Sequence, residues 1–188
     1  MKKFTSACFL VVLSCVLAAC GGPSHMVKKE QCPKVAEIKP APGKSAMVIS
    51  RTTSFGAAIE FETYLDQKMI GVTKGKSYFA KDDIEPGKKH IIVKAENTEA
   101  VQVDFEADKI YFLQHNVAMG IWKARVVMEA VNAARLDGGD LDGCSYYVYD
   151  TKQPGEDLTE QDFRASIKEA QKLVVKADGK AELVQMGQ

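Results

Sequence analysis

Residues 58–65 read AIEFETYL, and residues 101–108 read VQVDFEAD. In both stretches apolar side chains take every second position, and polar or charged side chains take most of the positions between them. A period of two with a polar opposite face is typical of a strand in an antiparallel sheet that has one face in solvent. The two stretches therefore predict that the chain folds around such a sheet.

Further strands are expected at 46–51, 68–73, 77–81, 89–96 and 110–117. Between two of them, Glu85-Pro86-Gly87-Lys88 places proline where φ is preset and glycine where φ must be positive, as a type II turn requires. Short strands at intervals of roughly 8–12 residues are typical of a β-sandwich or barrel. We predict a mainly β fold, an antiparallel β-sandwich of about seven strands with a C-terminal helix.

The helix is expected at about 160–175. Thr159 and Asp162 have the spacing of a capping box, and Leu158 and Phe163 have that of a hydrophobic staple. The helix either packs against the sheet or binds a partner or a membrane surface, and its narrow apolar stripe favours packing. Residues 123–131 fit a strand or a helix; we expect a strand followed by a short helical turn.

The first nineteen residues have the layout of a secretory signal peptide. Lys2 and Lys3 precede the apolar stretch 7–17, and Ala18-Ala19 supply small residues before Cys20. The alternative is a transmembrane helix, but the uncharged stretch 4–19 is shorter than the roughly 20 residues that a span needs. The length favours a signal peptide.

Leu17-Ala18-Ala19-Cys20 resembles a bacterial lipobox. The resemblance implies that Cys20 becomes the N-terminus and carries diacylglycerol and an acyl chain such as palmitate. Two or more acyl chains hold a protein stably on a membrane. Gly21 in place of aspartate resembles an outer-membrane sorting signal, which implies a lipoprotein of the bacterial envelope, in the outer membrane and facing the periplasm.

The chain has five cysteines. Cys8 and Cys15 leave with the leader and Cys20 carries lipid, so Cys32 and Cys144 remain. An even remainder in an oxidising compartment predicts a disulfide between them; the alternative is two free thiols. Closing a loop of this length contributes roughly 4–5 kcal/mol in the chain-entropy model.

The composition fits one globular domain with appendages. Removing Lys2 and Lys3 leaves 23 basic residues against 25 acidic ones, and this balance gives no reason to expect a nucleic-acid partner. Residues 20–44, which hold four of the six prolines, are expected to form a lipidated N-terminus and a tether. Residues 45–150 are expected to form the β-sandwich, and residues 151–188 a helical extension. With Cys32 bonded, the free tether would be 21–31, a reach of roughly 35 Å.

No pattern in the sequence predicts catalysis, a metal or another cofactor. Gly43-Lys44-Ser45 and Gly75-Lys76-Ser77 lack the preceding glycine of a phosphate-binding loop. The stretch 137–143, DGGDLDG, lacks the first and last ligands of a calcium loop and is expected to be a solvated turn. His90 and His115 lie on predicted strands and form no known motif.

Tyrosines 146, 147 and 149, beside Cys144, form either a binding patch or an edge strand packed near the cysteine. Isolated carboxylates such as Glu60 and Glu62 are expected on an exposed face.

Residues 45–131 resemble a β-rich domain of unknown function found in bacterial envelope lipoproteins. Three stretches carry the resemblance: AMVISR, FETYLDQKMIGVTKGKSYFAKDDIEPGKKHIIV and DKIYFLQHNVAMGIWKARVVMEAV. The middle of this region is also similar to PEGA-type repeats, through a turn near Asp66, Gly71, Pro86-Gly87 and His90. It has Asp66-Gln67-Lys68 where that pattern has Asp-Gly. Neither resemblance implies a catalytic residue.

The expected function is that of a lipid-anchored, non-catalytic module of the envelope. Such a module would bind or scaffold an envelope protein, peptidoglycan or a polysaccharide. The alternative is a periplasmic lipoprotein that binds a small ligand or a metal through His90, His115 or the tyrosines.

Overall fold

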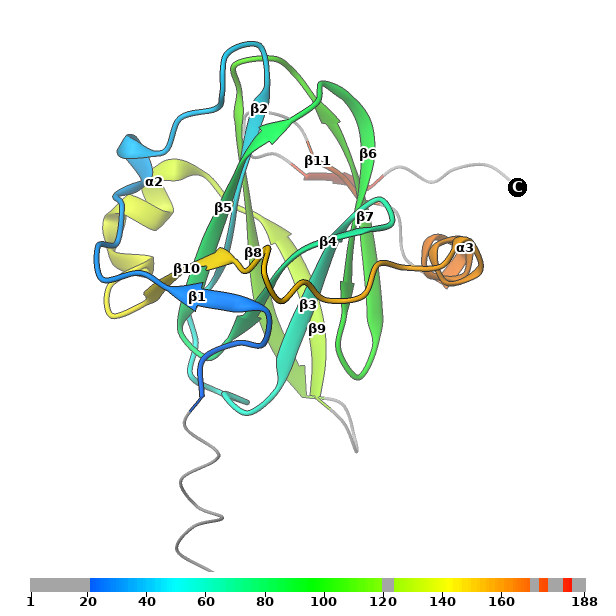
Figure 1. Ribbon diagram of the computed structural model, residues 1–188, viewed down its shortest axis with the longest axis horizontal. Helices are drawn as coiled ribbons and strands as arrows, with labels where there is room; N and C mark the ends of the chain where they lie inside the picture. Colours follow the sequence, from blue (N-terminus) through cyan, green and yellow to red (C-terminus); the bar gives the residue numbers. More distant parts are fainter. Residues whose placement is uncertain (1–20, 120–123, 170–172, 176–180, 184–188) are drawn as a thin grey trace, which may run out of the picture.

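The structure is a computed structural model that describes residues 21–119, 124–169, 173–175 and 181–183 (Figure 1). Two twisted sheets face each other in it. In spatial order the first sheet consists of β1 (Met26–Lys28), β10 (Ser145–Tyr149), β5 (Ser77–Ile84), β2 (Ser45–Arg51), β8 (Ile110–Met119) and β9 (Ala124–Ala130). The second consists of β12 (Ala181–Leu183), β11 (Leu173–Val175), β7 (Thr98–Phe105), β6 (Gly87–Lys94), β3 (Glu60–Leu65) and β4 (Lys68–Lys74).

The predicted fold class is confirmed, because the chain is a mainly β, mostly antiparallel sandwich with a C-terminal helix. The described ranges hold more strands than the seven or so expected, since the short strands β1, β11 and β12 extend the sheets. Three neighbouring pairs are parallel: β2 with β8, β5 with β10, and β7 with β11. The first of these arises because the chain crosses from β7 in one sheet to β8 in the other.

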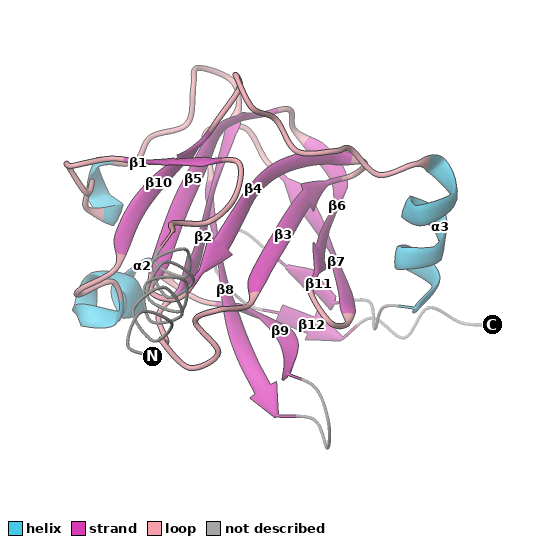
Figure 2. Cartoon of the chain, turned by 60° about the horizontal axis from the view of Figure 1, so that its bottom comes forward, coloured by secondary structure: helices cyan, strands magenta, loops and turns pink. Residues whose placement is uncertain are grey.

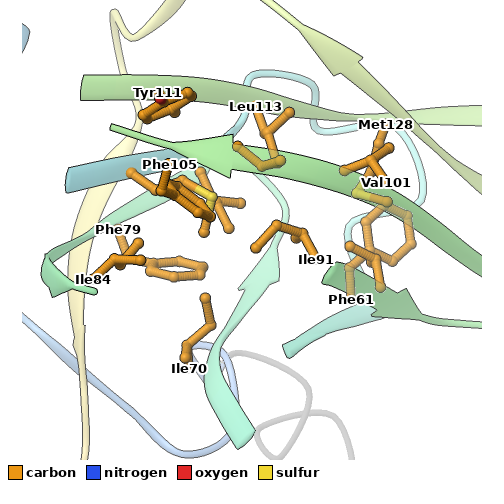
Figure 3. Packing of buried hydrophobic residues seen from close by; sticks show 14 of the residues in the cluster. Phe61, Ile70, Phe79, Ile84, Ile91, Val101, Phe105, Tyr111, Leu113 and Met128 are labelled. Carbon is orange, nitrogen blue, oxygen red and sulfur yellow. The ribbon is translucent and has the colours of Figure 1, made fainter. Parts of the chain in front are cut away.

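The core lies between the two sheets (Figure 3). Phe61 of β3 and Val101, Val103 and Phe105 of β7 are buried in it, as their alternation predicts. Phe79 of β5 also lies in this core. The remaining members of the core come from β2, β4, β5, β6, β8 and β9: Met47, Ile49, Ile70, Ile84, Ile91, Val93, Tyr111, Leu113, Val126 and Met128.

The outer faces of the sheets are also apolar, which corrects the expectation of a solvated face. On the first sheet, Val48, Tyr78 and Phe112 lie in a second buried cluster. On the second sheet, Tyr64, Met69, Val72, Ile92 and Ala100 lie in a third. Segments from outside the sandwich cover both clusters, because exposed apolar surface of this extent is unfavourable in water.

Residues 21–44 form part of the folded unit, which differs from the predicted tether. Strand β1 pairs with β10, and a 3-10 turn, η2 (Val35–Glu37), crosses the first sheet. Val35 and Ile38 are only 3% and 7% exposed and pack in the second cluster. The many prolines and lysines of this segment made it resemble a tether, and the two apolar residues gave no periodic pattern. Their burial holds the segment to the sheet.

The helix α3 (Glu160–Glu169) begins as predicted. The backbone N–H of Asp162 donates to Thr159 Oγ1 at 3.1 Å, and buried Leu158 packs with Phe163 over the second sheet. The helix is shorter than expected, because Leu173–Val175 forms β11 and pairs with the edge of β7. Figure 2 shows α3 beside this sheet.

Two local predictions at the ends of elements are confirmed. Gly87 has a φ of +116°, in the range that its turn requires. Residues 124–130 form a strand, and the short α2 (Ala133–Arg135) follows it, capped by the Asn132 side chain. A π-helical turn, η3 (Leu136–Asp140), completes the segment that returns over the first sheet.

Gly71 tests how tightly the core is packed. A Cβ at Gly71 would lie 2.7 Å from Cζ of Phe79. We expect Gly71→Ala to lower the free energy of unfolding by about 1–3 kcal/mol through overpacking, measured by urea unfolding. Gly21→Ala is the matched control, because nothing lies within 4 Å of its added Cβ. Equal stability of the two variants would contradict the packing argument.

Candidate binding surface

A groove runs across the outer face of the first sheet, where the segment 32–39 lies on β5 and β10. It consists of two cavities that share Pro33, of about 410 and 510 Å³. The first is lined by residues 32–36, Tyr78, Leu136, Leu141 and Asp142. The second is lined by Pro33, residues 37–39, residues 80–83, Tyr146 and Val148. We call the two cavities together the outer groove.

Two tyrosines from neighbouring strands contribute to the lining of the outer groove. The rings of Tyr78 on β5 and Tyr146 on β10 are 5.0 Å apart and tilted at 44°. The parallel register of β5 and β10 pairs these two residues directly. The hydroxyl of Tyr78 donates to the carbonyl of Pro33 at 2.9 Å and so holds the crossing segment to the sheet.

Electrostatics keep both tyrosines neutral. Burial, with the nearby Cys32 thiol, raises the pKa of Tyr78, and burial beside Asp82 raises the pKa of Tyr146. The charged residues that line the groove are mixed in sign: Lys34, Glu37, Lys39, Lys81, Asp82, Asp83 and Asp142. Aromatic rings with polar groups of both signs around them suit binding by contact and hydrogen bonding.

Cys32 and Cys144, the predicted disulfide partners, lie together beside the first cavity. Both are free thiols in the structure, so the predicted bond is not formed in it. The Sγ of exposed Cys32 is 3.9 Å from the carbonyl oxygen of buried Cys144. Burial raises the pKa of Cys144, which keeps it a thiol rather than a nucleophilic thiolate. The third predicted site residue, Cys20, lies outside the described residues.

The two histidines on strands lie in different layers of the fold, His90 on the outer face of the second sheet under Phe163 and His115 in the core beside Phe61. The His90 ring packs edge-on against Phe163, 5.8 Å between centroids, and its backbone N–H donates to Asp66. His115 is fully buried in the core, where its Nδ1 is 2.9 Å from Thr73 Oγ1. They cannot share a ligand.

Arg51 is a buried cation next to His115. Its guanidinium donates to the carbonyls of Phe55, Gly56 and Ile59 at 2.7–2.9 Å and lies 4.2 Å from the centre of the Phe61 ring. Burial lowers the pKa of Arg51 to about 10, so it stays charged at neutral pH. These contacts position the loop 52–59, and Arg51 lines neither cavity of the outer groove.

The tyrosine run does not form one patch. Tyr146 lines the outer groove, whereas buried Tyr147 packs against Gly22. The hydroxyl of Tyr149 accepts from the N–H of Gly155, on a different part of the surface. Successive strand residues point to opposite faces, which separates Tyr146 from Tyr147 and Tyr149.

The GKS fragments and the calcium-like turn occupy defined places in the fold. Strands β2 and β5 begin at Ser45 and Ser77, so a strand follows each GKS fragment, as expected. In the calcium-like turn, Arg135 bonds both Glu129 and Asp140, at 2.8 and 2.9 Å. Within the described ranges, no three acidic, histidine or cysteine side chains are grouped to hold a metal.

In comparisons with known proteins, no family model, curated protein or solved structure matches this chain. The resemblance to envelope lipoprotein domains and PEGA-type repeats therefore stays a prediction. Among the described residues, no helix has both the length and the apolar character of a membrane span.

Sequence reasoning missed Arg51, Tyr78 and the outer groove. A signal for Arg51 was present, because it shares the inward face of AMVISR with Met47 and Ile49. The groove had no local signal, because it forms between a segment and strands that are distant in the sequence.

The first prediction from this site concerns Tyr78. Tyr78→Phe removes the hydrogen bond to the Pro33 carbonyl, and we expect it to lower the free energy of unfolding by about 1 kcal/mol, measured by urea unfolding. Tyr146→Phe is the control, because its hydroxyl bonds no described residue. A larger loss in the control would show that Tyr78 does not hold the segment.

The second prediction concerns how the stability of the protein depends on pH. Burial, and then the Arg51 charge, lower the pKa of His115 to about 3 in the folded protein. Between this value and the unfolded value near 6.5, the unfolded chain binds the extra proton, so stability falls as the pH drops, by up to about 1.4 kcal/mol per unit. We expect His115→Gln to flatten this dependence between pH 6.5 and 4 in urea unfolding, and His90→Gln to leave it steep. Equal slopes in both variants would contradict the assignment.

Proposed function

We propose that the chain is a lipid-anchored, non-catalytic lipoprotein of the bacterial envelope that binds or scaffolds a partner through the outer groove. The observation that carries the proposal is the groove itself, which has half-buried Tyr146 packed against buried Tyr78 and a rim of mixed charge. An extended segment of an envelope protein or a polysaccharide strand is the kind of partner that these features suit, because aromatic faces and scattered polar groups bind such chains.

The proposed non-catalytic role is compatible with the positions of the groups that could act in catalysis. Among the described residues, His115 is buried without access to either cavity, and the thiol of Cys144 has a raised pKa. General acid–base or nucleophilic catalysis requires a titratable group within hydrogen-bond reach of a bound substrate, and His115 cannot meet this requirement for a ligand in the outer groove.

One observation favours the alternative, a small-ligand-binding lipoprotein. The two cavities, of about 410 and 510 Å³, fall in the size range of ligand pockets. The two functions predict different results. A small ligand would copurify with the protein and be released on denaturation, whereas a macromolecular partner would be captured by crosslinking.

Crosslinking from within living cells tests the proposed function. A photoreactive residue in place of Lys39 or Asp82, at the second cavity, is expected to capture one discrete partner. The control is Glu106, exposed at the end of β7, which should capture none. The same products from all three positions, or none from the groove positions, would count against a groove-binding module.

The anchor is tested through Cys20. We expect Cys20→Ser to accumulate as an unprocessed precursor that keeps its leader, because the hydroxyl cannot receive the thioether-linked lipid. Mass spectrometry of the whole protein measures this. Cys32→Ser is the control and should mature normally; normal maturation of Cys20→Ser would refute the anchor.

The disulfide remains part of the proposal, because an oxidising compartment favours pairing of thiols held this close. We expect non-reduced peptide mapping of the protein from the envelope to join Cys32 to Cys144. Two alkylatable thiols in the native protein would refute the bond.

A further inference from the structure

We propose that the loop 52–59 is a membrane-contacting surface that places Phe55 in the lipid headgroup region beside the anchor. This inference deepens the proposed function and rests on the lipid at Cys20. The partner is the lipid surface of the bilayer in which that anchor is embedded.

The loop is apolar and exposed at its tip. Residues 52–59 read TTSFGAAI and contain no charged side chain. Phe55 is 51% exposed, more than Val27 at 41% and Val127 at 38%. Ala57 and Ala58 beside it are exposed too. Uncharged loops with an exposed aromatic residue are suited to the membrane interface.

Arg51 fixes the shape of this loop. Its guanidinium holds three carbonyls of the loop from the buried side, and the Ile59 N–H donates to the Gly56 carbonyl at 2.9 Å. Gly56 has a φ of +64°, which makes the turn sharp. The loop therefore presents Phe55 in one conformation, which reduces the entropy lost on contact with a surface.

The start of the described chain lies at the same end of the sandwich as this loop. Ser24 bonds the Glu60 carboxylate twice, through its N–H at 3.1 Å and its hydroxyl at 2.5 Å, and Glu60 directly follows the loop. Figures 1 and 2 both place the beginning of the described chain next to the loop that enters β3.

The distance to the anchor is short. Gly22 already packs against the ring of Tyr147, where an added Cβ would come within 2.9 Å. One residue, Gly21, separates Cys20 from Gly22, so the Cα atoms of the two lie at most about 7 Å apart. The anchor therefore holds the loop-bearing end of the sandwich close to the bilayer.

The charges at this end suit anionic lipid headgroups. Ala57 abuts the turn at Gly75, which Lys74 and exposed Lys76 flank. Glu60 is held by Ser24 and by Lys74, whose Nζ is 3.3 Å away. Lys74 is thus paired, and exposed Lys76 beside the uncharged loop adds electrostatic attraction to an anionic leaflet.

Tryptophan fluorescence on vesicles tests the inference. The probe is the mature, acylated protein with Trp122→Phe, reconstituted in phosphatidylethanolamine–phosphatidylglycerol vesicles with or without brominated acyl chains. Phe55→Trp should show blue-shifted emission and lose most of its intensity in the brominated vesicles. Glu85→Trp is the matched control at the opposite end, where β2 begins beside Ile84, and should be unaffected.

The outcomes separate the inference from the proposed function. A protein that carries the lipid and sediments with vesicles, but in which bromine quenches Phe55→Trp no more than Glu85→Trp, would overturn the loop contact and leave the anchor standing. A protein without lipid on Cys20 would overturn both. Hydrogen exchange of the unsubstituted protein provides a second measurement: amides of 52–59 should exchange more slowly on vesicles than in the unacylated protein, and equal rates would overturn the contact.

Discussion

The constraint on which the rest of the structure depends is that both sheets are apolar on both faces. A sandwich buries only the two inner faces, so the outer faces must be covered by other parts of the chain. Val35 and Ile38 cover one, and Leu158 with α3 covers the other. The segments on either side of the sandwich are therefore structural parts of the domain, and the proposed anchor is joined to it by very few residues.

Arg51 connects the core to the surface. A guanidinium without water is costly unless its donors are bonded. Three loop carbonyls and the face of Phe61 meet most of that requirement, although Nε has no partner among the described residues, and these bonds hold the loop 52–59 to the core. The same charge, with burial, keeps His115 neutral. Arg51 thus acts as a support for the loop.

The outer groove is a consequence of how the first sheet is covered. The segment 32–39 crosses the strands at only a few contacts, with Tyr78 bonded to Pro33, and leaves cavities on both sides of itself. A sheet laid against another sheet would leave no such space. Stability and the proposed binding therefore depend on the same residues, and a bond between Cys32 and Cys144 would fix one wall of the groove.

The sequence by itself determined the features that depend on neighbouring residues. These are the inward alternation of Phe61 and Val103, the turn at Gly87 and the cap at Thr159, because strand period, turn geometry and capping are local. The expectations for a leader and a lipidated Cys20 also come from local pattern. Only the tertiary structure decided that residues 21–44 pack on the sheet, that β2 and β8 run parallel, and that His90 and His115 lie apart. Each of these depends on contacts between segments far apart in the chain, and no local pattern encodes which distant surface will need to be covered.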